Sequence, residues 1–356
     1  PQSKLVISWG TNPYYTNIHQ IPLIKEAKKN GALHVVINPD KIKSVEMADL
    51  FIQPTPGSDA ALALGVMNVI INESLYDSDF VENHTEGFAA LSERVQEHSP
   101  EKVEAITGVD EETIRKFAVI YADSKPSFIT LAKSMDFQDR CFDDSAIDII
   151  NSALGIDSSY LQGITLERLR NDGVTRLNMP GEFHMPYKDL KFYTPSGKIE
   201  FYSEKMKRDG YNPLPAHIFI EEGPLTSPDL CKKHPIYLLT PLAKSFLNSN
   251  FANIGNPGSE EEKPILELNS LDAGRRGVKT GDKVRVFNER GECTLWASVG
   301  DYLKEGVAIN KSIWWNNLSP GGCNSNQTTP DRLADMGGGS TYNTNLVQIE
   351  KLNDPV

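Results

Sequence analysis

The chain has 356 residues, enough for two domains and a sizeable hydrophobic core. Its formal charge is −12, from 36 basic and 48 acidic side chains, and the basic residues form no cluster. Such an acidic surface repels phosphate backbones and argues against a nucleic-acid partner. No run of about 18 apolar residues indicates a membrane span. No signal peptide precedes the first apolar segment, so we expect a cytoplasmic protein.

The cysteines are too widely spaced for a metal site of their own. None of them forms a CxxC pair, so a zinc or iron–sulfur site built from these residues alone is not expected. Cys293 lies in an alternating apolar–polar segment and is predicted to be a small buried hydrophobe. The complete set is Cys141, Cys231, Cys293 and Cys323.

The first 135 residues or so alternate between strand and helix patterns. Short apolar runs predict strands at residues 5–9, 34–37, 48–52 and 128–131. Helical patterns occur at residues 21–30, 59–73 and 110–122, the last with Asp110 as its N-cap. This order predicts an α/β fold with a parallel, Rossmann-like sheet that binds its ligand at the carboxyl ends of the strands.

Polar, turn-forming loops follow three of these predicted strands. They are Gly10-Thr11-Asn12-Pro13, Asn38-Pro39-Asp40 and Pro56-Gly57-Ser58-Asp59. A nucleotide site needs glycines, so that backbone N–H groups reach phosphates, and Asn or Asp for ribose and base. Ordinary βα turns favour the same residues, which leaves a purely structural role open. The GxGxxG fingerprint is absent, so an NAD-type site is not indicated.

From about residue 234 the pattern changes to short strands. They are predicted at residues 235–240, 282–287, 293–299, 306–309 and 345–349, with a hairpin turn at residues 288–291. These strands indicate a closed, antiparallel-rich barrel of about six strands. Helices are predicted near residues 144–154 and 166–172, between the two units. The expected domains are therefore 1–140 (α/β), 141–233 (a helical and loop-rich connector) and 234–356 (barrel).

Several segments resemble, in order along the chain, the molybdopterin oxidoreductases, the dimethyl sulfoxide reductase and formate dehydrogenase superfamily. The longest is QPTPGSDAALALGVMNVIINESLYDSDFVENHTEGF at residues 53–88. The others are WGTNP at 9–13, TPSGKIEF at 194–201, LTP at 239–241, the segment at 268–282 and NQTTPDRLADMGGG at 326–339. The resemblance implies a Rossmann-like α/β domain followed by a six-stranded, double-psi-like barrel.

The resemblance also implies a cofactor, molybdopterin guanine dinucleotide carrying molybdenum or tungsten. Asp59 would accept hydrogen bonds from the guanine, and hydroxyl and amide groups of the barrel would line the pterins. Taken one at a time, such residues are also common in turns and caps. Carried over by position, the cofactor-binding residues are Gly10, Asn12, Thr16, His19, Asn38, Gly57, Asp59, Thr240, Ser245, Asn248, Ser249, Asn326, Tyr342 and Asn345.

The sequence departs from the family pattern in three places. Asn38-Pro39-Asp40 stands where many members have Asp-Pro-Arg, so a cation that could face a phosphate is lost. No segment matches the N-terminal iron–sulfur domain or the segment that supplies the metal's protein ligand. The chain therefore reads as a fragment whose iron–sulfur cluster is expected only in the part it lacks. A second gap is expected near Met135–Cys141.

The function implied by the resemblance is two-electron or oxygen-atom transfer on a small-molecule substrate, with an electron-transfer subunit as a partner. The fragment by itself is expected to be inactive, and no residue is assigned as catalytic or as a metal ligand. Two alternatives stay open. One is a non-redox hydratase or transhydroxylase of the same superfamily, and the other is a cofactor-free scaffold subunit that keeps the fold.

Overall fold

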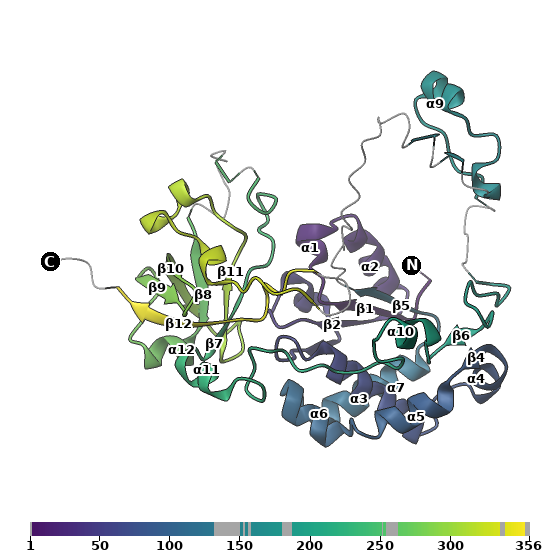
Figure 1. Cartoon of the computed structure of the whole chain (residues 1–356), viewed down its shortest axis with the longest axis horizontal. Helices are drawn as coiled ribbons and strands as arrows, with labels where there is room; N and C mark the ends of the chain where they lie inside the picture. Colours follow the sequence, from purple (N-terminus) through teal and green to yellow (C-terminus); the bar gives the residue numbers. More distant parts are fainter. Residues whose placement is uncertain are drawn as a thin grey trace.

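The structure is a computed structural model of the chain, and Figure 1 shows its α/β unit, connector and barrel. It describes residues 2–131, 150–151, 154–155, 158–179, 187–250, 252–253, 263–334 and 339–352. The gap expected near Met135–Cys141 and most of the helix predicted at 144–154 lie outside these residues. None of the helices within these ranges has the length and hydropathy needed to traverse a membrane.

Four strands form the parallel sheet that the apolar runs predict. They pair in the order β3-β2-β1-β5, and every pairing is parallel. The strands are β1 (Leu5–Trp9), β2 (Leu33–Ile37), β3 (Leu50–Ile52) and β5 (Ser127–Leu131). The predicted Rossmann-like sheet is confirmed.

Helices cover both faces of this sheet (Figure 1). On one face α3 (Asp59–Asn72), α6 (Pro100–Thr107) and α7 (Glu111–Asp123) pack over a buried apolar core, and α2 (Gln20–Lys29) covers the other. Asp110 caps α7 as predicted, because its carboxylate accepts the Thr113 N–H at 2.8 Å. The smaller elements of the unit are α1 (Pro13–Thr16), η1 (Lys43–Met47), α4 (Ser78–His84), β4 (Thr85–Glu86) and α5 (Phe88–Val95).

The C-terminal unit is a closed barrel with strand order β10-β8-β11-β7-β12-β9. Two pairings, β8–β10 and β7–β11, are parallel and the others are antiparallel, which confirms the predicted antiparallel-rich, six-stranded barrel. Cys293 is 2% exposed in its apolar core, as predicted. The strands are β7 (Ile236–Leu239), β8 (Ile265–Asn269), β9 (Lys283–Phe287), β10 (Glu292–Gly300), β11 (Val307–Asn310) and β12 (Asn345–Lys351).

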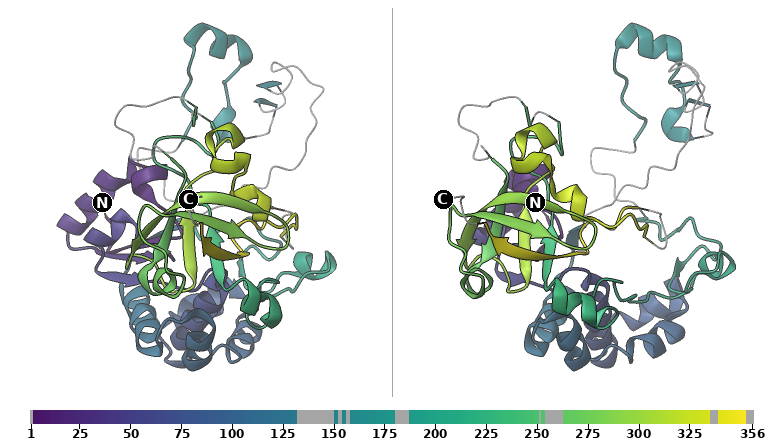
Figure 2. Two further views of the ribbon diagram at one scale, coloured as in Figure 1. Left: turned by 90° about the vertical axis from the view of Figure 1, so that its left-hand side faces the viewer. Right: turned by 60° about the vertical axis from the view of Figure 1, so that its left-hand side comes forward.

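The connector is mostly loop. Its short elements are η2 (Ser159–Leu161), α9 (Leu166–Asp172), β6 (Ile199–Glu200), α10 (Glu204–Arg208) and α11 (Pro228–Lys233). The remaining elements, in the barrel unit, are α12 (Ser270–Arg275), η3 (Asn316–Leu318), η4 (Pro320–Gly322) and η5 (Ser325–Thr328). The predicted helix at 166–172 is confirmed, and Figures 1 and 2 both show it standing away from the sheet and the barrel.

The α/β unit packs against the outer face of the barrel. Leu239, Val307 and Ile309 of β7 and β11 form a buried apolar cluster with Leu303, separate from the barrel interior. At this face Asp40, in the loop after β2, forms an antiparallel β-bridge with Leu303. The carboxyl edge of the sheet is therefore the edge that meets the barrel.

The contact buries charge as well as apolar surface. Burial and, less strongly, the nearby Glu267 carboxylate raise the pKa of Asp40, Lys311 lowers it, and the net result is a pKa of about 6. Lys311 Nζ pairs with Glu267 at 2.6 Å, so one ammonium serves two neighbouring carboxylates. Ionised Asp40 is thus incompletely compensated where the two units meet.

Packing between α3 and α6 gives the first prediction. A Cβ at Gly65 would lie 2.9 Å and 3.0 Å from the two methyl carbons of Val103, which is fully buried. Gly65→Ala should lower the free energy of unfolding by about 1–3 kcal/mol, measured by urea denaturation. Gly274→Ala in α12, where nothing lies within 4 Å, should instead be neutral or stabilising by up to about 1 kcal/mol. Equal effects of the two substitutions would contradict this packing.

The half-buried Asp40 gives a pH prediction. Its folded-state pKa of about 6 lies above the ordinary 3.8, so its favourable contribution is complete below about pH 4 and is lost as the pH rises through 6. The effect of Asp40→Asn on the free energy of unfolding should therefore be more favourable at pH 7.5 than at pH 4, by about 1–2 kcal/mol. Urea denaturation at both pH values measures this, with the exposed Asp331→Asn as control. A pH-independent effect of Asp40→Asn would count against it.

Candidate functional site

The loop after β1 contains two buried polar atoms that lack partners. Gly10 has a φ of 64°, and its N–H donates to Ile37 O at 2.8 Å, which fixes the start of the loop on the neighbouring strand. Thr11 Oγ1 and Asn12 Oδ1 follow, both buried and both without a hydrogen-bond partner in the described part of the chain. Orphaned polar atoms of this kind are rare in folded proteins, so this loop fits a ligand that supplies the missing hydrogen bonds.

Thr16 is the last residue of α1, and His19 is the residue before α2. Thr16 Oγ1 donates to Asn12 O at 3.0 Å, so Thr16 holds the loop in shape. His19 is exposed at the N-cap of α2, and its side chain makes no cap hydrogen bond. The Thr16 hydroxyl is thus used inside the loop, whereas the His19 ring makes no hydrogen bond to the start of α2.

The turn at residues 56–59, here called the PGSD turn, opens α3. Gly57 has a φ of 79°, which favours glycine, and Ser58 Oγ donates to Thr55 O at 2.6 Å. Asp59 is the first residue of α3, exposed, and it accepts a 2.7 Å hydrogen bond from Trp9 Nε1. The carboxylate is therefore held between the end of β1 and a helix N-terminus, leaving further acceptor capacity for a ligand.

The loop after β2 is used for contacts inside the protein. Asn38 is 9% exposed, and its Oδ1 accepts the Asp40 N–H at 2.9 Å. Asp40 in turn bridges to Leu303 of the barrel. This loop positions the α/β unit against the barrel, and the amide oxygen of Asn38, one of the predicted cofactor-binding residues, already has an internal donor.

A lysine of the barrel, which the sequence did not single out, enters the α/β unit beside the PGSD turn. Lys304 Nζ lies 3.3 Å from the hydroxyl oxygen of Thr55, which is two residues before Gly57 along the chain. The same Nζ lies 3.2 Å from Thr107 O. Burial lowers the pKa of Lys304. No local pattern marks this residue, since it sits in an ordinary strand-connecting turn.

Barrel loops carrying the other predicted residues gather at one end of the barrel. Thr240 N–H donates to Asn343 Oδ1 at 3.3 Å, and Ser249 O accepts the Trp315 indole N–H at 2.6 Å. Trp314 packs edge-to-face on Phe246, with ring centroids 5.1 Å apart. Exposed or half-buried side chains here are Ser245, Asn248, Ser249, Asn326 and Tyr342, and Asn248 takes a φ of 51°.

Asn345 occupies a different environment from those loops. It is fully buried at the start of β12, where its Oδ1 accepts from Asn288 Nδ2 at 3.1 Å and Arg290 Nη2 at 3.0 Å. Its Nδ2 donates to Thr328 Oγ1 at 2.8 Å. Both the oxygen and the nitrogen of the Asn345 side-chain amide are thus already hydrogen-bonded to residues of the barrel unit.

The two groups of predicted residues meet at the PGSD turn. A Cβ placed on Gly57 would lie 3.7 Å from Thr344 Cγ2, in the loop between Tyr342 and Asn345. Asn343 of the same loop holds the backbone of Thr240. The α/β and barrel loops therefore adjoin here, while no hydrogen bond or ion pair between described residues joins the 245–249 loop or Asn326 to the sheet.

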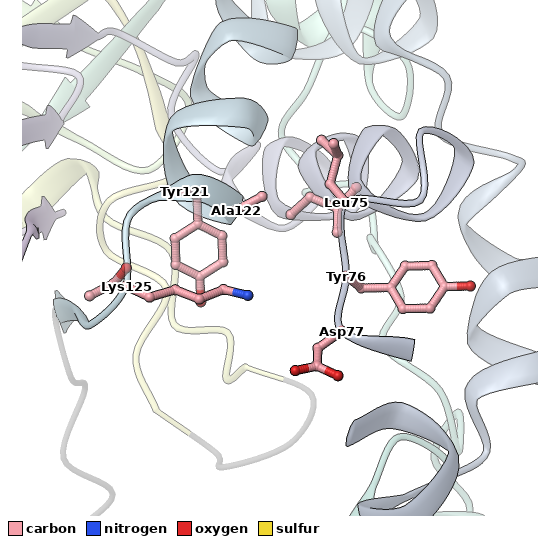
Figure 3. A pocket seen from close by; sticks show the side chains of 8 residues that line it. Leu75, Tyr76, Asp77, Tyr121, Ala122 and Lys125 are labelled. Carbon is pink, nitrogen blue, oxygen red and sulfur yellow. The ribbon is translucent and has the colours of Figure 1, made fainter. Parts of the chain in front are cut away.

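A separate cavity of about 260 Å³ lies away from this junction (Figure 3). Leu75, Tyr121 and Lys125 line it, and Lys125 precedes the amino end of β5, so the cavity is at the sheet edge opposite the PGSD turn. Within the ranges that the structure describes, no three His, Cys, Asp or Glu side chains come together in a way that could hold a metal ion.

Two family models match the chain in the order of its units. Residues 1–157 match the molybdopterin oxidoreductase model, and residues 236–346 match the model of the molydopterin dinucleotide binding domain. The solved structure of acetylene hydratase from Pelobacter acetylenicus covers the fold with a TM-score of 0.75, over 98% of this chain and 78% of that chain. At 20% identity, this likeness shows the fold alone.

Three curated relatives illustrate the range of similarity. The probable oxidoreductase YoaE of Bacillus subtilis (strain 168) is 27% identical over 522 residues, covering 98% of this chain and 75% of the relative. Acetylene hydratase of Syntrophotalea acetylenica is 48% identical over 121 residues, 34% of this chain and 17% of the relative. Dimethyl sulfoxide reductase DmsA of Escherichia coli (strain K12) is 32% identical over 210 residues, 53% of this chain and 25% of the relative.

The matches differ in how much of each protein they span. The alignment with YoaE has 522 positions and this chain has 356 residues, so YoaE has segments that face gaps in this chain. The chain spans a quarter or less of the other two relatives. With its α/β unit and its barrel both matched by family models, the chain belongs to the molybdopterin oxidoreductase superfamily.

Proposed function

We propose that the PGSD turn, the loop after β1 and the adjoining barrel loops hold a molybdopterin guanine dinucleotide that carries molybdenum or tungsten. The observation that carries this proposal is the pair of buried, unpartnered atoms Thr11 Oγ1 and Asn12 Oδ1 beside the junction with the barrel. A polar ligand at this place would relieve their desolvation cost. The barrel's match to a dinucleotide-binding domain supports the same ligand.

Each loop has a role in this proposal. The left-handed Gly10 backbone lets phosphates approach closely, the left-handed Gly57 shapes the PGSD turn, and the N-terminus of α3 favours negative charge. Asp59, oriented by Trp9, accepts from the guanine N–H groups. Thr11, Asn12 and His19 supply further polar atoms around the dinucleotide.

The barrel loops would face the pterins. Neutral hydroxyl and amide groups suit this task, because they pair with pterin edges without adding charge to a site that already holds phosphates. The side chains assigned to it are Thr240, Ser245, Asn248, Ser249, Asn326 and Tyr342. Asn345 and Asn38 act indirectly, through the hydrogen bonds that shape their loops.

When bound, the metal and its pterins would supply the chemistry of two-electron or oxygen-atom transfer, while the protein supplies binding, orientation and electrostatics. The substrate is a small molecule, and an electron-transfer subunit completes the redox reaction. The curated names of relatives such as dimethyl sulfoxide reductase and formate dehydrogenase support redox chemistry.

A second candidate is hydration without net redox change. The 48% identity to acetylene hydratase, over 121 residues, favours it. The cofactor-loaded protein distinguishes the two: a hydratase converts acetylene without any electron acceptor, whereas an oxidoreductase turns over only when a donor or acceptor dye is present.

The role of Asp59 gives a prediction for cofactor retention. Asp59→Ala removes a charged acceptor for guanine N–H groups, so binding of the dinucleotide should weaken by roughly 1.5–3 kcal/mol. Metal and pterin content per chain should fall, while the melting temperature changes little because Asp59 is exposed. Asp79→Ala, in the first turn of α4, is the matched control. Unchanged cofactor content in Asp59→Ala would defeat the assignment.

A further inference from the structure

An ion pair between a buried carboxylate and a partly exposed arginine joins the connector to the barrel. Glu222 is 5% exposed, and its two carboxylate oxygens lie 2.6 Å from Arg290 Nη1 and 3.2 Å from Arg290 Nη2. Glu222 Oε2 also accepts the Leu346 N–H at 3.1 Å. Two parallel donors to one carboxylate fix its orientation as well as its position.

Arg290 reaches two further parts of the barrel from the hairpin turn between β9 and β10. Its Nε donates to Thr328 O at 2.7 Å, and its Nη2 donates to Asn345 Oδ1 at 3.0 Å. The guanidinium therefore holds the connector, η5 and the start of β12 together. A lysine at this position lacks the planar fork needed for all of these contacts.

The connector segment that contains Glu222 also contacts the PGSD turn. Ile220, two residues before Glu222, packs so closely on Gly57 that a Cβ there would lie 2.7 Å from Ile220 Cγ2. Residues 220–227 form a tight turn, because Thr226 Oγ1 lies 2.6 Å from Ile220 O and Ser227 Oγ donates to Glu221 O at 2.6 Å. A shift of Glu222 is thus passed to Ile220.

We propose that Glu222 and Arg290 are positioning residues for the cofactor. Their ion pair presses Ile220 onto Gly57 and so fixes the PGSD turn and the N-terminus of α3 in the geometry that receives the dinucleotide. This inference rests on the proposed function, and it adds that the geometry of a loop in the α/β unit is set by an arginine of the barrel.

Amide hydrogen exchange of the purified protein tests this. In Arg290→Lys the amides of residues 57–62 should exchange at least tenfold faster than in wild type, while those of β1 and β2 keep their rates. Pterin content should fall in parallel. Arg285→Lys is the matched control, since Arg285 pairs with Glu292 and Glu350 on the barrel surface and touches no connector residue among its described ion pairs.

A second variant keeps the test decisive if Arg290→Lys does not fold. Ile220→Ala leaves the ion pair intact but removes its contact with Gly57, so it should accelerate exchange at residues 57–62 in the same way. If residues 57–62 exchange at the wild-type rate in Ile220→Ala or in folded Arg290→Lys, the inference is wrong. It is also wrong if these residues exchange faster while the pterin content per chain stays at the wild-type level. Wild-type protein devoid of pterin would count against the proposed function instead, and the exchange rates would still decide whether the ion pair fixes the turn.

Discussion

The contact between Glu222 and Arg290 joins two parts of the chain, because its carboxylate comes from the connector and its guanidinium from the barrel. The Glu222 carboxylate is buried, so leaving it without Arg290 would be strongly unfavourable, whereas Arg290 itself still reaches solvent. Around them Asn345, Thr328 and the Leu346 backbone satisfy the remaining donors and acceptors. The position of Ile220 on Gly57, and with it the shape of the PGSD turn, follows from this network.

The second constraint is the contact between the sheet and the barrel, where charge is less evenly balanced. The carboxyl edge of the sheet is the edge expected to bind a nucleotide. Part of it contacts the barrel instead, through the β-bridge between Asp40 and Leu303. Lys304 enters the α/β unit beside Thr55, and Lys311 serves both Glu267 and Asp40. The loop after β2 is thus a contact between the α/β unit and the barrel.

Local pattern was sufficient for most of the fold. The apolar runs at 5–9 and 34–37 became β1 and β2 within one residue, because buried parallel strands leave an uninterrupted apolar signature. β8 was not predicted, because its outward-facing Glu267 interrupts a short apolar segment. Asn345, predicted to face a pterin, is held inside the barrel, and Glu222–Arg290 was missed, because both depend on partners far apart in sequence.

If one cofactor lies between the carboxyl edge of the sheet and the end loops of the barrel, its binding should protect both units at once. Hydrogen exchange of cofactor-loaded and cofactor-free protein measures this. Loading should protect residues 10–12 and 57–60 of the α/β unit together with residues 240–249 and 340–345 of the barrel. Protection confined to one of the two units, or absent from both in protein that carries the cofactor, would contradict it.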